Sequence, residues 1–319
     1  MAPRDCDVLV VGSGVIGLTT GVCLAETGLR VRIRTAALPQ STTSRAASAM
    51  WGPSFAEPRD RVLRWTEVTL DDLRELANRA DTGVRTARGT LASRRTAEPP
   101  PPDVFPGLEV CPPDELPEGF VGAFRVLLPI VDMPRYLDYL LARLAEAGGE
   151  IEVRALRTLA EAAEEAPVVV NCAGIGARDL VPDPALRPVR GQHVVVENPG
   201  LDDFFMEEPL GTQWAGYFPH GDQVVLGGNA DLDEWSLDPD PATAEGIVRR
   251  CVEVEPALAG ARIVEHRVGL RPSRASVRLE EERIGSSRCV HNYGHGGSGV
   301  SLSWGCAREI RAMLTGTTG

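Results

Sequence analysis

The chain reads VLVVGSGVIG at residues 8–17, an apolar run followed by Gly12, Gly14 and Gly17. The apolar run predicts a buried parallel strand, residues 14–27 predict the helix that it feeds, and residues 29–35 predict the next strand. In such a βαβ unit the glycines permit a tight turn, a close backbone approach to a pyrophosphate, and tight packing of the helix on the strand. A dinucleotide at the amino end of this helix is therefore expected.

The end of the second predicted strand leaves the kind of dinucleotide open. This strand and the residue after it read VRIRTA at 31–36, without the acidic residue that usually binds the adenine ribose. Arg34 could instead accommodate a 2′-phosphate, so an NADP-dependent reductase is one alternative. A protein that binds a nucleotide without chemistry is another.

A second glycine-rich segment lies near the carboxyl terminus. Residues 290–307 read VHNYGHGGSGVSLSWGCA, with five glycines between an apolar run and a predicted helix. Each glycine costs about 1 kcal/mol of conformational entropy relative to alanine, so such a cluster is usually kept where a side chain would collide with a ligand. Two turns of this kind at opposite ends of the chain predict one extended cofactor held from both sides.

The composition restricts the classes of partner and of chemistry. The net charge of -12 disfavours nucleic acids and anionic membranes, because both require a basic surface. All 33 basic residues are arginine, which excludes Schiff-base chemistry and a Walker-type lysine. The seven cysteines form no CxxC pair, and no signal sequence or long apolar run is present, so we expect a soluble, cytoplasmic protein. The oligomeric state stays open between monomer and homodimer.

The periodicity of the remaining sequence predicts an α/β fold of two interleaved domains. Helices are expected at 60–78, 134–147 and 241–255, strands at 168–174, 193–197, 217–219, 223–227, 263–270 and 288–292, and an irregular excursion at 98–117. The dinucleotide domain would comprise 1–56, 133–182 and 263–319. A strand-rich α+β domain that binds the substrate would comprise 57–132 and 183–262.

Taken together, these motifs resemble the D-amino-acid oxidase family over nearly the whole chain. The resemblance rests on residues 10–18, 41–47, 171–174 (NCAG), 188–192 (PVRGQ), 226–228 (LGG), 269–274 (GLRPSR) and 291–297 (HNYGHGG). It implies a Rossmann-like domain that binds FAD, and an enzyme that oxidises D-amino acids with oxygen to 2-oxo acids, ammonia and hydrogen peroxide. A D-aspartate oxidase, a glycine or sarcosine oxidase, and a D-amino-acid dehydrogenase remain alternatives within related flavoenzymes.

The resemblance also implies how the substrate is bound. Arg271 would clamp the substrate carboxylate with its planar guanidinium, the Tyr217 hydroxyl would assist it, and the Gly297 carbonyl would accept a hydrogen bond from the substrate amine. Gln213 replaces a second tyrosine of the animal enzymes, with Trp214 beside it. No side chain is expected to act as acid or base, since catalysis rests on orienting the α-hydrogen for hydride transfer to flavin N5.

The residues implied to hold FAD fall into two glycine-rich turns and the segment after the second strand. The pyrophosphate is assigned to the first turn and to three hydroxyl residues, and the flavin to the other positions. They are Gly12, Gly14, Val15, Ile16, Gly17, Thr42, Thr43, Ser44, Ala47, Ser48, Ala49, Met50, Gly296, Gly297, Gly299, Val300 and Ser301. Ala36 replaces the family's ribose-binding acid, so FAD is expected to bind weakly.

Three other features are interpreted as structural. His291 and His295 are four residues apart, but no carboxylate or thiol is expected to complete a site around them, so no metal is predicted. The acidic run at 280–282 is interpreted as the solvated tip of a hairpin. Cys306 is expected to be a packing residue with no base beside it.

The preferred substrate is predicted from the distribution of cations. A D-aspartate oxidase needs a second cation for the side-chain carboxylate, yet no arginine lies between Gly191 and Arg249. That segment instead contains Met206, Glu207, Glu208, Gln213 and Trp214. Neutral or basic D-amino acids are therefore expected to be preferred, unless Arg274 reaches the site from elsewhere.

Overall fold

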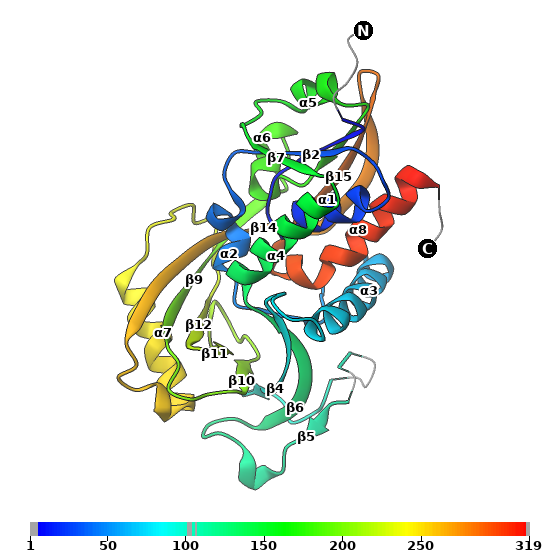
Figure 1. The fold of residues 1–319 in the computed structure, drawn as a ribbon. Coiled ribbons are helices and arrows are strands. Elements are labelled where there is room, and N and C mark those ends of the chain that lie inside the picture. The colour runs from blue at the N-terminus through cyan, green and yellow to red at the C-terminus, as the bar shows by residue number, and fades with distance from the viewer. Residues whose placement is uncertain (1–5, 101–103, 106, 317–319) are drawn as a thin grey trace.

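The computed structural model describes residues 6–100, 104–105 and 107–316, whose main strands join into one sheet (Figure 1). Its parallel part consists of β1 (Val8–Val11), β2 (Val31–Thr35), β7 (Glu150–Val153) and β8 (Val168–Asn171). β1 lies between β8 and β2, and β2 pairs with β7. Every residue of β1 is buried, which explains its uninterrupted apolar sequence, because helices cover both faces of a parallel sheet.

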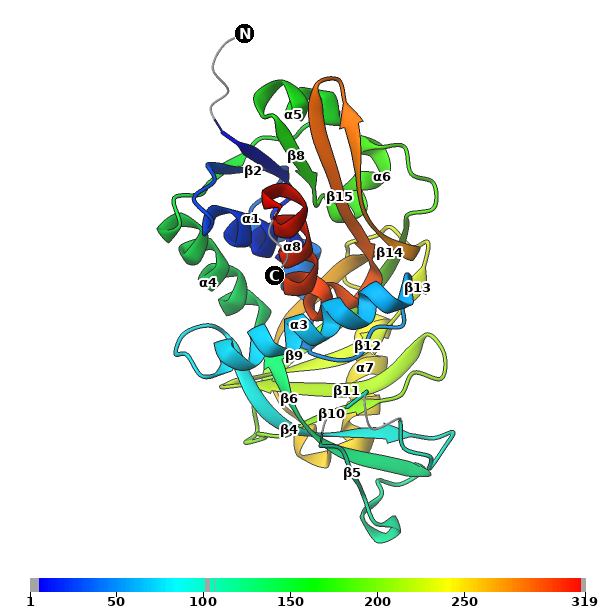
Figure 2. The ribbon, with the colours of Figure 1, turned by 90° about the vertical axis from the view of Figure 1, so that its right-hand side faces the viewer.

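Alternating residues of β1 supply the cores on the two faces. Val8 and Val10 pack into one cluster with α1 (Val15–Ala25), α4 (Met133–Glu146) and α8 (Gly299–Thr315), and α3 (Arg59–Ala77) packs onto α8 from outside. Leu9 and Val11 face α5 (Leu159–Glu165) on the other side. Figure 2 shows α1, α4 and α8 gathered beside the parallel strands, with α3 crossing below them.

The second part of the sheet is mostly antiparallel. Its strands are β3 (Ala49–Met50), β4 (Val84–Ser93), β5 (Glu109–Val110), β6 (Gly122–Val131), β9 (Arg187–Glu197), β10 (Phe204–Glu207), β11 (Gln213–His220), β12 (Gln223–Asn229) and β13 (Asp231–Leu232). The helix α7 (Pro241–Val254) packs on β9, β11 and β12 through Ile247 and Cys251. The short helices are η1 (Pro39–Ser41), α2 (Thr43–Ala46), η2 (Pro113–Glu115), η3 (Gly174–Gly176), α6 (Ala177–Leu180), η4 (Pro256–Leu258) and η5 (Gly296–Ser298).

One long strand joins the two parts. β14 (Ile263–Ile284) pairs with β9 over residues 263–273 and with β15 (Ser287–His295) over residues 273–284. β15 in turn lies parallel to β8. The sheet therefore continues from the antiparallel part into the parallel part, with β14 common to both. The predicted domain limits remain a prediction, and residues 1–5 and 317–319 of those ranges lie outside the described residues.

The predicted helices at 60–78, 134–147 and 241–255 agree with α3, α4 and α7 to within one residue. The long strands β4 and β6 were not predicted, because they are stabilised by pairing with each other, a contact between distant residues that no local pattern records. The acidic run 280–282 was misplaced: it lies within β14, and the hairpin turns after it. The excursion at 98–117 contains β5 and η2, and its residues 101–103 and 106 are not described.

Candidate active site

A cavity of about 730 Å³ lies where the carboxyl ends of β1, β2 and β8 meet β9 and β14. Its wall includes Val11 and Thr35 at the ends of β1 and β2, Cys172 just after β8, and His193 and Arg271 from β9 and β14. Ligands of open α/β sheets bind at the carboxyl ends of the strands. The position of this cavity agrees with that rule and with the predicted role of the first glycine turn.

The first glycine turn shapes one end of the cavity. Gly12 has a φ of 103°, and a Cβ atom there would lie 2.5 Å from the carbonyl oxygen of Cys172, so only glycine fits. A Cβ atom on Gly17 would lie 1.9 Å from the Gly12 carbonyl oxygen. Gly17 therefore permits the close contact of helix and turn and is not itself part of the cavity wall. The amino end of α1 borders the cavity, and its N-cap residue Gly14 has no side chain to cap it, which is a favourable arrangement for an anion.

The hydroxyl segment forms the wall beside this turn. Thr42, Thr43 and Ser44 all line the cavity, as predicted from the resemblance. Ser44 Oγ accepts a hydrogen bond from the Val15 N–H at 2.9 Å, and Thr43 Oγ1 donates to the Leu270 carbonyl oxygen at 3.2 Å. Thr42 Oγ1 donates to the Pro39 carbonyl oxygen at 2.7 Å. These hydroxyls thus hold the wall together, and of the three it is Ser44, here an acceptor, that keeps its proton for a ligand.

Arg34 lines the same end but is already neutralised. Its guanidinium forms ion pairs with Glu152 and with Glu165, the latter at 2.7 Å. A 2′-phosphate would have to compete with two carboxylates for this charge, so the arrangement disfavours an NADP site. Ala36 is exposed on the cavity wall, and no acidic side chain stands at that position.

The carboxyl-terminal turn closes the cavity on another side. Gly296, Gly297, Gly299 and Val300 line it, and α8 begins at Gly299. A Cβ atom on Gly299 would lie 3.8 Å from Val15 Cγ1, so the amino ends of α1 and α8 are neighbours. Two helix amino ends therefore point into one cavity, which favours a ligand with separated sites of negative charge.

Four other residues that the resemblance assigned to FAD lie behind the wall. Ala49 and Met50 form β3, which pairs with β6, and Ser301 Oγ accepts a hydrogen bond from the Gly52 N–H at 3.1 Å. Ser48 Oγ lies 3.1 Å from His193 Nε2. Their side chains are engaged with the protein instead of the cavity.

Arg271 lies at the other end of the cavity wall. Its Nη1 donates to the Asn229 carbonyl oxygen at 3.0 Å, and within the described residues it has no carboxylate partner. Burial lowers the pKa of Arg271 from its ordinary value. A Cβ atom on Gly297 would lie 3.6 Å from Arg271 Cδ, so the structure brings these two predicted residues together. A guanidinium withdrawn from bulk water without an anion favours binding of a carboxylate.

Tyr217 does not accompany Arg271, contrary to the prediction. Tyr217 pairs with Leu226, and Leu226 pairs with Val194 in β9. Leu226 and Val194 pack against α7, so the Tyr217 side chain also lies on that face and stacks on Phe205 with ring centroids 5.7 Å apart. Successive side chains of a strand point to opposite faces, and Gly191 and Arg271 lie on the face away from α7. The structure therefore does not bring the Tyr217 hydroxyl to Arg271.

Gln213 is also remote from the cavity. Its side chain is exposed, and its Oε1 accepts a hydrogen bond from Nη1 of Arg250, on α7, at 2.9 Å. The structure therefore gives no support to a substrate contact by Gln213.

The comparisons with known proteins agree with this geometry. Residues 7–313 match the family model described as FAD dependent oxidoreductase. The chain belongs to this family of FAD-dependent oxidoreductases. It is 49% identical to a D-amino-acid oxidase of Rubrobacter xylanophilus, over 96% of this chain and 94% of that protein. It is 33% identical to human D-aspartate oxidase, over 97% and 94%. The structure resembles glycine oxidase of Geobacillus kaustophilus with a TM-score of 0.82 at 20% identity, covering 99% and 96% of the two chains, which indicates a shared fold.

FAD, the cofactor of this family, fits the cavity. The backbone N–H groups at the amino end of α1 and the Ser44 hydroxyl offer donors for a pyrophosphate, and Gly12 permits its close approach. The glycines around the start of α8 leave room for a flat ring system. The neighbouring amino ends of α1 and α8 explain why an FAD-dependent oxidoreductase needs glycine-rich turns at both ends of its chain.

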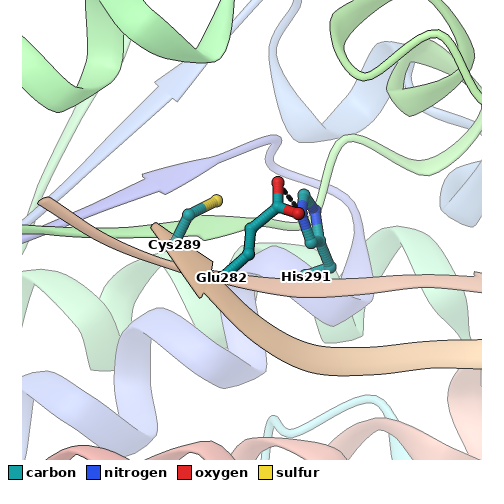
Figure 3. Close-up of side chains that lie close together, drawn as sticks. All are labelled: Glu282, Cys289 and His291. Atoms are coloured by element: carbon teal, nitrogen blue, oxygen red, sulfur yellow. Dashed lines mark hydrogen bonds and ion pairs between the residues drawn. The ribbon is translucent and has the colours of Figure 1, made fainter. Parts of the chain in front are cut away.

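Glu282, Cys289 and His291 form a second cluster of polar groups, which the sequence did not reveal (Figure 3). The expectation that no carboxylate or thiol lies near His291 was wrong: Glu282 Oε1 lies 2.8 Å from His291 Nε2, and the Cys289 thiol is adjacent. The Asn171 amide nitrogen lies 3.2 Å from His291 Nδ1, and its Oδ1 accepts the Ala173 N–H. Nδ1 is therefore the acceptor, and Nε2 carries the proton that Glu282 accepts. This pattern gives both ring nitrogens of His291 a protein partner.

Cys306 has a base beside it, which the sequence also did not reveal. Its Sγ lies 3.7 Å from His295 Nε2, and both residues are buried. Burial raises the pKa of the Cys306 thiol far above its ordinary value and lowers the pKa of His295 to about 4. Both groups are therefore neutral, which agrees with a packing role for Cys306.

His193 was not predicted as a site residue, yet it lies on the cavity wall between Arg271 and segment 46–48. It lies two residues after Gly191 in the PVRGQ motif, and that spacing places both on one face of β9. Residues 173–176 line the cavity as well. Their position at the carboxyl end of a predicted parallel strand was the available signal. Among the described residues, no helix combines the length and apolar character that crossing a bilayer requires.

Proposed function

We propose that this protein is a D-amino-acid oxidase. It would oxidise a D-amino acid to the imino acid, which water hydrolyses to a 2-oxo acid and ammonia, while oxygen is reduced to hydrogen peroxide. The observation that carries the proposal is the Arg271 guanidinium, which lies in the cofactor cavity without a carboxylate partner among the described residues. Relatives named D-amino-acid oxidases at nearly half identity support the same activity.

The residues of the cavity act mainly by orientation. Arg271 binds the substrate carboxylate, and the Gly297 carbonyl accepts a hydrogen bond from the substrate amine beside it. FAD supplies the acceptor of the hydride that leaves the α-carbon. Of the histidines on the described wall, His193 has protein partners at both ring nitrogens, and His295 Nε2 lies 3.7 Å from the Cys306 Sγ. No side-chain acid or base is therefore assigned to the chemical step.

Neutral and basic D-amino acids are the preferred substrates in this proposal. Arg274 is paired with Asp183 at 3.1 Å and is not part of the cavity wall, so it does not supply a second cation. Of the other arginines on the wall, Arg34 and Arg154 pair with Glu165, and Arg157 pairs with Glu161 at 3.0 Å. A second substrate carboxylate would find no unpaired arginine there.

The remaining assignments belong to the same proposal. Seven buried cysteines without a disulfide fit the reducing cytoplasm. The cofactor domain comprises 1–56, 133–182 and 263–319, and the substrate domain comprises 57–132 and 183–262.

The decisive experiment compares two arginine variants of the FAD-loaded protein. Arg271→Ala is expected to lower kcat/KM for D-alanine by roughly 30-fold to a few thousand-fold, the effect of losing about 2 to 5 kcal/mol at a buried charged contact. Arg274→Ala is the matched control, and its kcat/KM should stay within about threefold, because it lies off the cavity wall. Equal losses in both variants would overturn the role of Arg271.

Two further measurements complete the test. Anaerobic D-alanine should bleach the visible flavin absorption of the wild-type protein, and peroxide release across a panel of D-amino acids should rank D-alanine and larger neutral or basic substrates above D-aspartate. An absorption that no D-amino acid bleaches would refute the oxidase. D-aspartate as the best substrate would refute the predicted preference.

A further inference from the structure

His193 connects the two ends of the cavity. It lies on β9, two residues after Gly191, on the cavity face of the strand, and 7% of its surface is exposed. Its Nδ1 lies 2.7 Å from the Ala46 carbonyl oxygen and its Nε2 lies 3.1 Å from Ser48 Oγ. One ring thus holds both ends of a short segment of the opposite wall.

The hydrogen bonds define the state of the ring. A carbonyl oxygen can only accept, so Nδ1 carries the proton and Nε2 accepts from the Ser48 hydroxyl. Burial, followed by the charge of Arg271, lowers the pKa of His193 to about 4. The ring is therefore neutral near pH 7, with a single tautomer.

The segment that His193 holds runs along the cavity wall. At its amino end Ser44 Oγ accepts the Val15 N–H at the start of α1, and at its carboxyl end Ser48 binds His193. Ala46 and Ala47 line the cavity in between. A Cβ atom on Gly269 would lie 3.2 Å from Ala46 Cβ, so the segment also rests against β14, the strand that carries Arg271. The wall from the glycine turn to Arg271 is thus one connected element.

We propose that His193 is a positioning residue: by binding both Ala46 and Ser48 it fixes segment 44–48 and so sets FAD in register with the carboxylate held at Arg271. This inference rests on the proposed function, because it assigns the cavity to FAD and the carboxylate to Arg271. A small error in the relative position of reacting atoms costs rate more than affinity. Loss of the two hydrogen bonds should therefore lower kcat, leave KM nearly unchanged and alter the flavin itself.

The test uses holoenzyme variants at position 193 and one matched control. His193→Phe keeps a ring and removes both hydrogen bonds, and we expect kcat for D-alanine to fall about 10- to 100-fold with KM within threefold. Its flavin midpoint potential and visible absorption maximum should shift. His193→Gln offers a donor and an acceptor and should restore kcat to within about threefold of wild type. His220→Phe, the control, removes a half-buried histidine that is not on the cavity wall and should leave the flavin unchanged.

A second variant tests the inference even if the position 193 variants fail to fold because the packed His193 ring cannot be replaced. Ser48→Ala removes one of the two hydrogen bonds without changing the ring, and kcat should fall about 3- to 10-fold. Acetate, titrated as a carboxylate probe against the flavin absorption, should bind all position 193 and 48 variants within threefold of wild type, because Arg271 is intact. Weaker acetate binding in proportion to kcat would overturn the inference, since His193 would then belong to the carboxylate site.

Unchanged kcat and flavin spectrum in both His193→Phe and Ser48→Ala would also overturn it. Failure of the proposed function is a separate result, because it appears in the wild-type protein as a flavin that no D-amino acid bleaches. If no D-amino acid bleaches the flavin, the flavin midpoint potential, its absorption maximum and the acetate titration still test the role of His193.

Discussion

The guanidinium of Arg271 lies directly over Gly191, since a Cβ atom on Gly191 would be 2.3 Å from Arg271 Nη1. The two residues belong to the paired strands β14 and β9, where Gly269 faces Gly191. Because Gly191 has no side chain, it leaves room for the Arg271 guanidinium. From this position Arg271 donates a hydrogen bond to the Asn229 carbonyl oxygen.

Gly191→Ala should accordingly impair substrate binding without unfolding the protein. The new methyl group meets the far end of a flexible side chain, so the guanidinium moves and the backbone does not. We expect KM for D-alanine to rise about 10- to 100-fold, equivalent to about 1.4 to 3 kcal/mol. Gly211→Ala, in open space, is the control and should leave KM unchanged. Equal KM values for the two variants would show that Arg271 tolerates displacement.

Tyr217→Phe should have almost no effect on catalysis. The Tyr217 ring packs beside α7 and Phe205, on the face of the sheet away from Arg271. We therefore expect kcat/KM within about twofold of wild type, whereas one lost hydrogen bond to a bound carboxylate would cost about 1.5 to 3 kcal/mol. Steady-state kinetics with D-alanine distinguishes these two outcomes. A tenfold loss of kcat/KM would show that the Tyr217 hydroxyl contacts the substrate.

Ala36→Glu should tighten FAD binding. Position 36 is exposed on the cavity wall after β2, where a carboxylate can accept hydrogen bonds from a ribose. Hydrogen bonds to a charged group are worth about 1.5 to 3 kcal/mol, and repulsion from the negative charge of Glu152 opposes part of this gain. We therefore expect the dissociation constant of FAD to fall about tenfold. Ala36→Gln tests the charge and should have a smaller effect. A picomolar dissociation constant in the wild-type protein, measured by dilution and flavin fluorescence, would contradict the expected weak binding.

Acid should destabilise the folded protein through its buried histidines. Burial lowers the pKa of His193 and of His295 to about 4, and that of His220 to about 3, from an ordinary value of 6.5. Below pH 6.5 the unfolded chain binds protons that the folded chain does not. The free energy of unfolding should therefore decrease as the pH falls from about 6.5 to about 4, by up to about 1.4 kcal/mol per pH unit for each histidine.

Denaturant titrations at pH 7, 6 and 5 measure this decrease. His193→Gln removes one of the titrating groups, so its unfolding free energy should depend less steeply on pH than that of the wild type. Parallel curves for the two proteins would show that the pKa of His193 is the same in the folded and the unfolded state.

Local sequence determined the βαβ unit, the helices α3, α4 and α7, and the two glycine turns. The helices depend on contacts between near neighbours, because a helix repeats its apolar face every few residues. A Cβ atom on Gly17 would likewise clash with the nearby Gly12 carbonyl, whereas one on Gly12 would clash with the distant Cys172. Arg271 and Gly297 could be assigned because their motifs are short and continuous. Their closeness in the structure agrees with that assignment.

Only the tertiary structure decided which face of the sheet each side chain occupies and which charges are already paired. Tyr217 was predicted to lie beside Arg271, but its position in β11 places its side chain on the face that packs against α7. The pairing of Arg34 with Glu165 and the bonds of His193 to Ala46 and Ser48 join residues far apart in the chain, and the cluster around His291 forms across the β14–β15 hairpin. No local pattern records such contacts, because the sheet register creates them when β9, β14 and β15 align.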